Sequence, residues 1–244
     1  MKHENNNSIN PQEILTDLSD CTVCPRNCHA NRLEKPSGYC RTGAGIPIAS
    51  LCIHRGEEPI ISGKMGIINL FFAGCNLRCV FCQNYEISFY GKPDFETVCG
   101  YGTNSGIWEW SLKELVDSII EKLDAGYRSV GFVSPSHVVP QAVSVIRALN
   151  ARGYRPVIVW NTNTYEKPET IRMLDSLVDV YLPDFKYITP TVAKELSDAE
   201  DYPLFAAAAI AEMYHQRGNQ VHLSKNGTAN RGLIIRHLVI PGFI

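Results

Sequence analysis

Five short apolar runs, separated by segments with helical spacing, most constrain the fold of this 244-residue chain. Each run has the length of a buried β-strand, and the segments between the runs repeat apolar residues at the period of an α-helix. Strands that alternate with helices pack as a parallel sheet covered by helices. The runs lie at 67–73, 129–133, 157–160, 178–182 and 233–240. We therefore expect an α/β fold with a parallel sheet of about five strands, curved or closed.

The clearest helix start follows residue 110. Ser111 and Glu114 form an S-x-x-E capping box, and the apolar residues after them recur on one helix face. Pro168 marks a second start, because proline is favoured in the first turn of a helix. Further helices are expected at 140–151, 168–177, from 191 onward and at 203–216.

The first apolar run meets Gly74 and is followed at once by Cys75, Cys79 and Cys82, in the order C-x3-C-x2-C. Three thiolates on one loop can bind three irons of a cubane cluster, whereas such clusters usually have four cysteine ligands. The fourth iron then has an open position, and open positions are where metal enzymes act on substrates. The alternatives are a zinc knuckle or three buried thiols. The strand before the loop and the glycine at its turn favour the cluster.

A second cysteine group lies near the N-terminus. Its spacing is C-x2-C-x3-C-x11-C, and it comprises Cys21, Cys24, Cys28 and Cys40. Four thiolates in a short segment without apolar periodicity predict a closed site that holds zinc or a further iron–sulfur cluster. A set of free thiols is the alternative, although so short a segment needs a staple to fold. The spacing does not choose the metal, and Cys52 and Cys99 fit neither group.

Polar residues follow the apolar runs, where parallel α/β folds place their functional groups. The D-x-K pair is the strongest of these, because its two charged side chains point to the same side of a strand end. Ordinary turn chemistry is the alternative for Ser134 and Asn163. The residues expected to face the site are Ser134, Ser136, His137, Asn161, Thr162, Asp184 and Lys186.

Composition sets limits on location and partners. A net charge of -2 gives no electrostatic case for binding nucleic acid or an anionic membrane. The polar first residues lack the apolar core of a signal peptide, and no apolar run reaches the roughly 18 residues of a spanning helix. We therefore expect a cytoplasmic protein. Nine cysteines in a reducing compartment indicate metal or redox chemistry in place of disulfides.

Over nearly its whole length, the chain resembles the pyruvate formate-lyase activating enzyme-like proteins of the radical S-adenosylmethionine (radical SAM) superfamily, in the branch with an N-terminal cysteine group. The matching stretches are CTVCPRNC, EEPIISG, FFAGCNLRCVFCQN, VSPSH, YLPDFKY and IRHLVIPG. The resemblance implies a partial parallel (β/α) barrel and a [4Fe–4S] cluster on Cys75, Cys79 and Cys82. It also implies that the free iron binds S-adenosylmethionine (SAM), which is reductively cleaved to a 5′-deoxyadenosyl radical that abstracts hydrogen from a substrate.

The resemblance also assigns roles to single residues. Asp184 and Lys186 match the D-x-K motif that lines the SAM and substrate pocket, and we interpret them as catalytic. Arg236 matches the arginine that approaches SAM, and Phe81 matches the residue that contacts the adenine. We expect Asn161, at its strand end, to contact the cofactor as well.

Two departures from the family pattern are visible. The Gly-Gly-Glu turn that holds the SAM amino group in activating enzymes is replaced by Ser134-Pro135-Ser136, so the contact would pass to the hydroxyls or to His137. Family members also continue to a sixth strand and a helix. We therefore expect a Cys-rich segment at 1–60 and a radical SAM core at 61–244 that is C-terminally truncated.

Two function classes remain open. In the first, the protein is an oxidoreductase that cleaves SAM, receives electrons from a flavodoxin- or ferredoxin-type reductant, and activates a glycyl-radical enzyme or acts on another substrate. In the second, it is an iron–sulfur or zinc-binding maturation or electron-transfer protein without SAM turnover. The open iron favours the first class, because open coordination positions are where metal enzymes act on substrates. In that class the cofactor carries out the chemistry, and the protein positions it.

Overall fold

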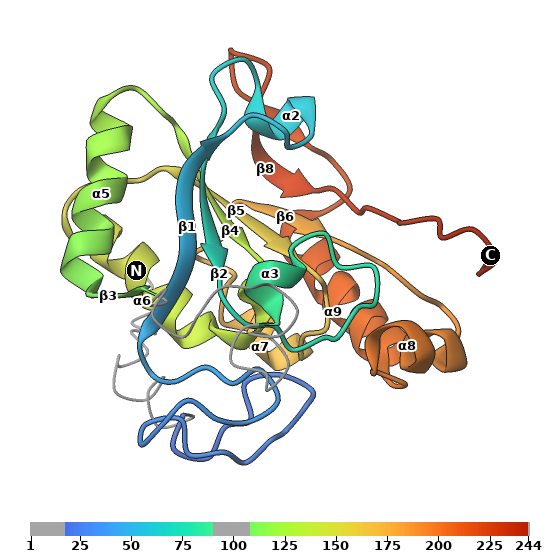
Figure 1. Ribbon diagram of the computed structural model, residues 1–244. Helices are drawn as coiled ribbons and strands as arrows, with labels where there is room; N and C mark the ends of the chain where they lie inside the picture. The colour runs from blue at the N-terminus through green and yellow to red at the C-terminus, as the bar shows by residue number, and fades with distance from the viewer. Residues whose placement is uncertain (1–17, 90–107, 244) are drawn as a thin grey trace, which may run out of the picture.

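The computed structural model describes residues 18–89 and 108–243, and Figure 1 shows their arrangement. Cys99 and the connection between the cluster loop and the first long helix fall outside the described residues. Within them, no helix is both long enough and apolar enough to cross a membrane.

A mixed, mostly parallel sheet forms the centre of the described structure (Figure 1). Its strand order is β3-β1-β2-β4-β5-β6-β8-β7. The strands are β1 (Ile46–His54), β2 (Ile67–Phe72), β3 (Trp108–Trp110), β4 (Ser129–Val133), β5 (Val157–Thr162), β6 (Val180–Pro183), β7 (His222–Leu223) and β8 (Ala229–Leu233). Neighbours from β2 to β8 pair in parallel, whereas β1, β3 and β7 pair antiparallel. The expected α/β class and its parallel core are confirmed, and the sheet is consistent with a partial α/β barrel.

The helices alternate with the parallel strands as expected. They are α2 (Pro59–Ser62), α3 (Tyr85–Ser88), α5 (Leu112–Asp124), the 3-10 helix η1 (Pro135–His137), α6 (Val139–Ala151), α7 (Pro168–Arg172), α8 (Pro190–Ser197) and α9 (Tyr202–Arg217). The predicted capping box starts α5, because the Glu114 backbone N–H donates to Ser111 Oγ at 3.2 Å and the Ser111 N–H donates to Glu114 Oε2 at 3.3 Å.

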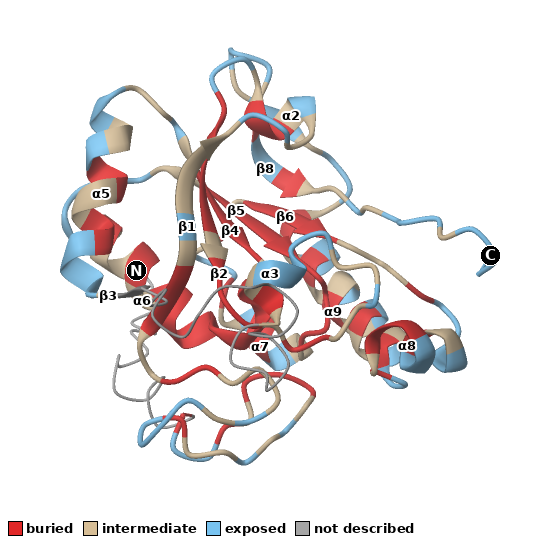
Figure 2. Ribbon diagram, in the orientation of Figure 1, coloured by how far each residue is buried: buried red, intermediate tan, exposed pale blue. Residues whose placement is uncertain are grey.

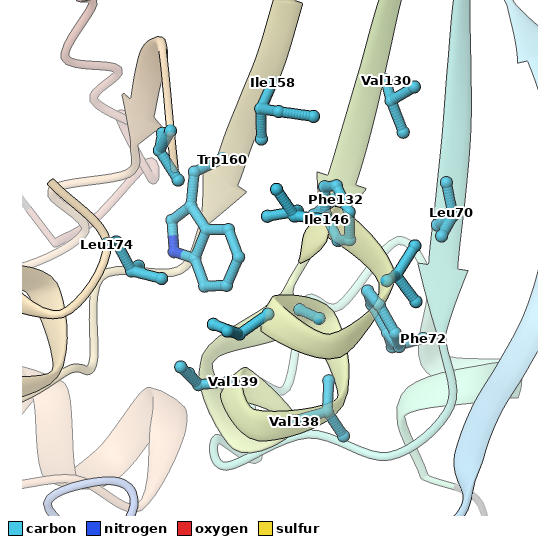
Figure 3. Packing of buried hydrophobic residues seen from close by; sticks show 14 of the residues in the cluster. Leu70, Phe72, Val130, Phe132, Val138, Val139, Ile146, Ile158, Trp160 and Leu174 are labelled. Atoms are coloured by element: carbon cyan, nitrogen blue, oxygen red, sulfur yellow. The ribbon is translucent and has the colours of Figure 1, made fainter. Parts of the chain in front are cut away.

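The main core lies between the sheet and the helices. The rings of Phe72, Phe132 and Trp160 stack in sequence across β2, β4 and β5, with centroids 6.2 and 5.9 Å apart (Figure 3). Figure 2 shows that the central strands are buried along their length. Burial of one such side chain contributes about 1.5–3 kcal/mol, so this layer fixes the sheet on which the site residues stand.

The opposite face of the sheet mixes apolar and polar residues. Ile67, Val159, Val180 and Leu182 pack there with Ile61 of α2. Asn69 and Asn161 lie two residues after Ile67 and Val159, on the same face of the sheet, and are also buried, at 1% and 9% exposure. This face therefore carries a buried polar centre.

One predicted strand was wrong in its position. The expected strand at 233–240 is replaced by β8, which ends at Leu233. Beyond it, the Ile234 and Arg236 N–H groups still donate to Tyr181 O and Pro183 O, and an isolated bridge pairs Arg236 with Asp184. Ile235 and Val239 are 53% and 60% exposed, so the apolar character of this run does not reflect a buried strand.

A predicted helix was too long. The helix expected at 168–177 ends at Arg172, and the chain continues in tight turns. Leu174 N–H donates to Ile171 O and Leu177 N–H donates to Leu174 O, each three residues back. These turns bring Val178 to the start of β6 while Ile171 and Leu174 stay buried, which explains why apolar spacing alone suggested a longer helix.

Candidate functional site

The cysteine loop begins where β2 ends. Gly74 has φ +80°, a conformation that L side chains rarely adopt, and its N–H donates to Ile87 O at 2.8 Å. The N–H groups of Arg78 and Val80 donate to the carbonyls of Ser197 and Leu196 at the end of α8, at 3.2 and 2.9 Å. The loop is therefore anchored at both ends by backbone hydrogen bonds.

Polar groups lie close to each of the three loop sulfur atoms. Ser197 Oγ donates to Cys79 Sγ at 2.9 Å, and Ser88 Oγ lies 3.2 Å from Cys82 Sγ. Cys75 Sγ accepts from the Leu77 N–H at 3.4 Å and from Asn163 Nδ2 at 3.5 Å. Such donors orient and tune sulfur ligands in metal centres.

Burial and a nearby charged group both affect the pKa of one thiol of the loop. Burial raises the pKa of the Cys79 thiol, while the Ser197 hydrogen bond and the Lys186 ammonium act in the opposite direction. Lys186 belongs to the predicted D-x-K pair, so the structure brings that pair close to the cysteine loop. A cation near a thiolate favours its ionised, metal-binding form.

The three cysteines fit an iron–sulfur cluster by the chemistry of their donor set. They provide three sulfur ligands on one loop, with hydrogen-bond donors already directed at them. Among residues 18–89 and 108–243, no group of three His, Cys, Asp or Glu side chains is already arranged to hold a metal ion. Binding would therefore require rotation of the cysteine side chains toward one another.

A charged network occupies the carboxyl ends of β5, β6 and β8. Asp184 binds two cations, because Lys186 Nζ donates to its Oδ2 at 2.7 Å and Arg236 Nε donates to its Oδ1 at 2.8 Å. Arg236 Nη2 also donates to Asn161 Oδ1 at 2.7 Å. The predicted residues Asn161, Asp184, Lys186 and Arg236 are therefore brought together at one place.

Two carboxylates complete this network and were not among the predicted site residues. Arg236 Nη1 lies 3.3 Å from Glu58 Oε1 and 3.7 Å from Glu57 Oε2. Glu57 also accepts from the amides of Asn69 and Asn161, at 3.0 and 3.2 Å. Both glutamates lie in the stretch EEPIISG, which was one of the stretches that carried the family resemblance, so the sequence contained a signal for them.

The network has an excess of negative charge. Its three carboxylates, Glu57, Glu58 and Asp184, exceed its two cations by one charge. Burial opposes ionisation of Arg236, but the carboxylates of Asp184, Glu58 and Glu57 raise the pKa of its guanidinium above the ordinary value. Glu58 Oε2 is buried without a hydrogen-bond partner within the described residues. These features suit a ligand that carries positive charge.

A buried tyrosine connects the network to the cysteine loop. The Tyr202 hydroxyl accepts from the Lys186 N–H at 3.0 Å, and it lies 2.6 Å from Asp184 O and 3.0 Å from Asn163 O. The side chain of Asn163 reaches Cys75 Sγ, as described above. Tyr202 is the first residue of α9 and does not follow a strand, so the rule for strand ends did not indicate its role.

Phe81 and a nearby cavity lie on the Lys186 side of the site. The rings of Phe81 and Tyr187 meet edge to face, with centroids 6.4 Å apart. A cavity of about 250 Å³ is bounded by Lys186 and Tyr187 and by residues after β8, including His237 and Phe243. This cavity offers room for part of a ligand beside the ion pair.

The serine and histidine residues after β4 lie deeper than the charged network. Ser136 Oγ lies 3.0 Å from Thr162 Oγ1 and donates to Asn163 Oδ1 at 3.3 Å, and it is fully buried. His137 Nε2 lies 2.9 Å from Ala73 O. Burial lowers the pKa of His137 to about 4, so the ring is neutral at pH 7. Ser134, half-buried with φ +53°, is the most accessible of the three.

The second predicted cysteine group also gathers in space. Cys21, Cys24, Cys28 and Cys40 line one small cavity beneath the cysteine loop. The eight described cysteines form no disulfide with one another. Burial raises the pKa of the Cys24 thiol to about 12.

Comparison with known proteins gives one informative likeness. No protein-family model matches the chain. The chain is 32% identical over 234 residues to the uncharacterized protein MJ0674 of Methanocaldococcus jannaschii, in an alignment that covers 95% of this chain and 60% of that protein. The chain therefore spans about three fifths of the length of that relative.

Proposed function

We propose that the protein is a radical SAM iron–sulfur enzyme with a partial (β/α) barrel of that type, which reductively cleaves SAM. One observation carries the proposal: the loop with Cys75, Cys79 and Cys82 lies beside a charged network with excess negative charge. Three cysteine ligands suit a cluster with one open iron. The network suits SAM, because its sulfonium and amino groups are cationic.

The residues of the chain have distinct parts in this proposal. Cys75, Cys79 and Cys82 would hold a [4Fe–4S] cluster, which when bound would supply the electron that splits SAM into methionine and a 5′-deoxyadenosyl radical for hydrogen abstraction. Asp184 and the unpaired oxygen of Glu58 provide negative charge for the cationic groups of SAM. Arg236 provides a guanidinium for its carboxylate.

The surrounding side chains would position the cofactor. Lys186 is held by Asp184 and offers its ammonium on the side of the 250 Å³ cavity. Phe81 offers an aromatic face for adenine, and Ser134 is the accessible hydroxyl after β4. Ser136 and His137 are buried, and support the loop from behind.

Partners follow from the same proposal. A flavodoxin- or ferredoxin-type protein would deliver the electron, and a glycyl-radical enzyme is one substrate class to test. The cytoplasm suits this chemistry because its reductants keep thiols reduced. The competing function, a maturation or electron-transfer protein, would use the same cluster without SAM turnover.

Electron paramagnetic resonance (EPR) tests the proposal. Anaerobically purified and reduced protein should show a [4Fe–4S] spectrum that changes when SAM is added, because SAM would occupy the open iron. A cluster spectrum that is indifferent to SAM would favour the electron-transfer alternative. The Cys75→Ala/Cys79→Ala/Cys82→Ala variant should lose the spectrum.

A further inference from the structure

The N-terminal cysteine group lies in a segment without regular secondary structure, which packs onto the main core through Leu18 and Val23. Among the described residues between Leu18 and Gly43, no helix or extended strand forms, and the backbone is held by turns. One turn is closed by the Asn27 N–H to Cys24 O hydrogen bond, and the longer loop is closed by the Cys21 N–H to Ala30 O and the His29 N–H to Cys21 O hydrogen bonds, all 3.1 Å. Four cysteines converge on the centre of this segment, where they line a cavity of about 10 Å³.

Two arginines line the same cavity, and within the described residues neither forms an ion pair with a carboxylate. Arg32 is only 1% exposed, and its Nη1 donates to Cys21 Sγ at 3.5 Å. Arg26 has a buried Nη2 without a hydrogen-bond acceptor. Backbone carbonyls, such as His137 O for Arg32 and Asn76 O for Arg26, accept hydrogen bonds from both groups but do not neutralise them. An unbalanced cation is costly away from water, so fully buried Arg32 and half-buried Arg26 favour negative charge in the cavity.

We propose that Cys21, Cys24, Cys28 and Cys40 bind a single divalent metal ion of the zinc type as a closed tetrathiolate site. A complex of four thiolates with one divalent ion has a net charge of about −2, which the positive charges of Arg26 and Arg32 balance. Four sulfur ligands in a closed tetrahedral site are typical of structural zinc.

The small size of the cavity favours a single ion over an iron–sulfur cluster. A volume of about 10 Å³ corresponds to roughly one water-sized sphere. One ion fits in that space once the sulfur atoms turn inward, whereas a four-iron cluster would have to displace the surrounding chain. Turning is required, because no three ligating side chains are already arranged for a metal within the described residues.

The site connects directly to the loop of Cys75. Arg26 Nε donates to Asn76 O at 2.8 Å, next to Cys75 in the chain. On the other side, a side chain added at Gly74 would place its Cβ 2.8 Å from Cys40 O. The metal ion would therefore order the surface on which the loop rests. The site itself does not depend on SAM chemistry.

Metal analysis tests the site separately from the proposed function. The Cys75→Ala/Cys79→Ala/Cys82→Ala variant should still contain one zinc per chain when measured by plasma mass spectrometry. Adding Cys24→Ala to that variant should remove the zinc, because one ligand is lost. Adding Cys52→Ala should leave it unchanged, since Cys52 lies on β1 and outside the cavity.

Three results would overturn the proposal: no zinc in the triple variant, equal zinc with and without Cys24, or four irons per chain remaining in the triple variant. A cobalt measurement covers the case in which Cys24→Ala does not fold. The triple variant, loaded with Co²⁺ in place of zinc, should bind one ion and show thiolate-to-cobalt charge-transfer absorption. Cobalt binding without that absorption would also contradict the tetrathiolate site.

Discussion

Arg236 Nε donates to Asp184 Oδ1 at 2.8 Å, and this contact fastens the segment after β8 to the end of β6. The backbone reinforces it, because the Arg236 N–H donates to Pro183 O at 2.9 Å and the Phe185 N–H donates to Arg236 O at 2.8 Å. The ion pair therefore has a structural role, and in the proposed function Asp184 also faces SAM. Substitutions at Asp184 should separate the two.

Replacing Asp184 with Ala should weaken SAM cleavage while leaving the iron content near normal. The change removes the carboxylate that pairs with Lys186 and one of the three that lie near Arg236, and Lys186 is only 12% exposed. Loss of a partner from a partly buried pair costs about 2 kcal/mol, less than in a fully buried pair. Release of 5′-deoxyadenosine under dithionite and iron analysis give the two readouts.

Asp117→Ala is the matched control, because Asp117 also binds a lysine and an arginine but lies on the surface. It should change neither readout. If Asp184→Ala cleaves SAM as fast as the parent, Asp184 serves only to hold the strand ends together.

Replacing Ser197 with Ala should make the reduction potential of the cluster more negative. Ser197 Oγ donates to Cys79 Sγ at 2.9 Å, and hydrogen bonds to ligand sulfur stabilise the reduced, more negative cluster. An EPR-monitored redox titration measures the change. Ser144→Ala is the control, since Ser144 Oγ donates to Pro140 O within α6. Equal potentials in the two variants would show that this bond does not act on the cluster.

Replacing Gly74 with Ala should destabilise the protein more than replacing Gly153 with Ala. Both glycines have positive φ, at 80° and 85°, so both changes incur about 1–2 kcal/mol of backbone strain. Only at Gly74 would the new Cβ meet other atoms, with Cys40 O and Thr42 Cγ2 at 2.8 Å, whereas nothing lies within 4 Å at Gly153. Overpacking adds roughly 1–3 kcal/mol. Urea unfolding of the two variants should therefore differ, and equal midpoints would argue against close packing between the two cysteine segments.

Glu166 should make stability fall as pH rises. Burial raises the pKa of its carboxyl to about 7 from the ordinary 4.5, against hydrogen bonds from Trp160 and Thr162. Between these pH values, the folded protein keeps a proton that the unfolded chain has released. The stabilisation is complete below pH 4.5 and is lost as pH rises through 7, by roughly 3 kcal/mol in all.

The Glu166→Gln variant isolates this effect. His137 acts in the opposite direction, because its lowered pKa of about 4 makes stability fall as pH drops. The readout is therefore the difference in unfolding free energy between parent and variant, measured from pH 5 to 8. That difference should change across this range, whereas Glu169→Gln, at an exposed position, should run parallel to the parent. A constant difference for Glu166→Gln would mean that Glu166 is ionised throughout.

The sequence predicted the elements with strong local signals. The strand at 129–133 and the capping box at Ser111 were correct, because hydrophobic period and cap chemistry are local properties. The strand at 233–240 was misplaced, because β8 ends at Leu233 and the apolar residues Ile235 and Val239 are exposed. The spacing of apolar residues does not show whether other parts of the protein bury them. The pairing of β1 with β2 and β3 depends on contacts between distant segments.

The site was predictable in part. The rule for strand ends found Asn161, Asp184 and Lys186, and the family resemblance added Arg236. Neither the rule for strand ends nor the family resemblance singled out Glu57 and Glu58, which enter the network from the loop after the antiparallel strand β1. The burial of Ser136 and His137 was also invisible to spacing, because it depends on the packing of η1 against β5 and the cysteine loop.

The most direct test of the central claim is the release of 5′-deoxyadenosine from SAM by anaerobically reconstituted protein under dithionite. The parent protein should release it, and the Cys75→Ala/Cys79→Ala/Cys82→Ala variant should release none while keeping its N-terminal metal. Parent protein that holds a [4Fe–4S] cluster at the Cys75 loop but forms no 5′-deoxyadenosine would contradict the claim, as would a triple variant that cleaves SAM at the parent's rate.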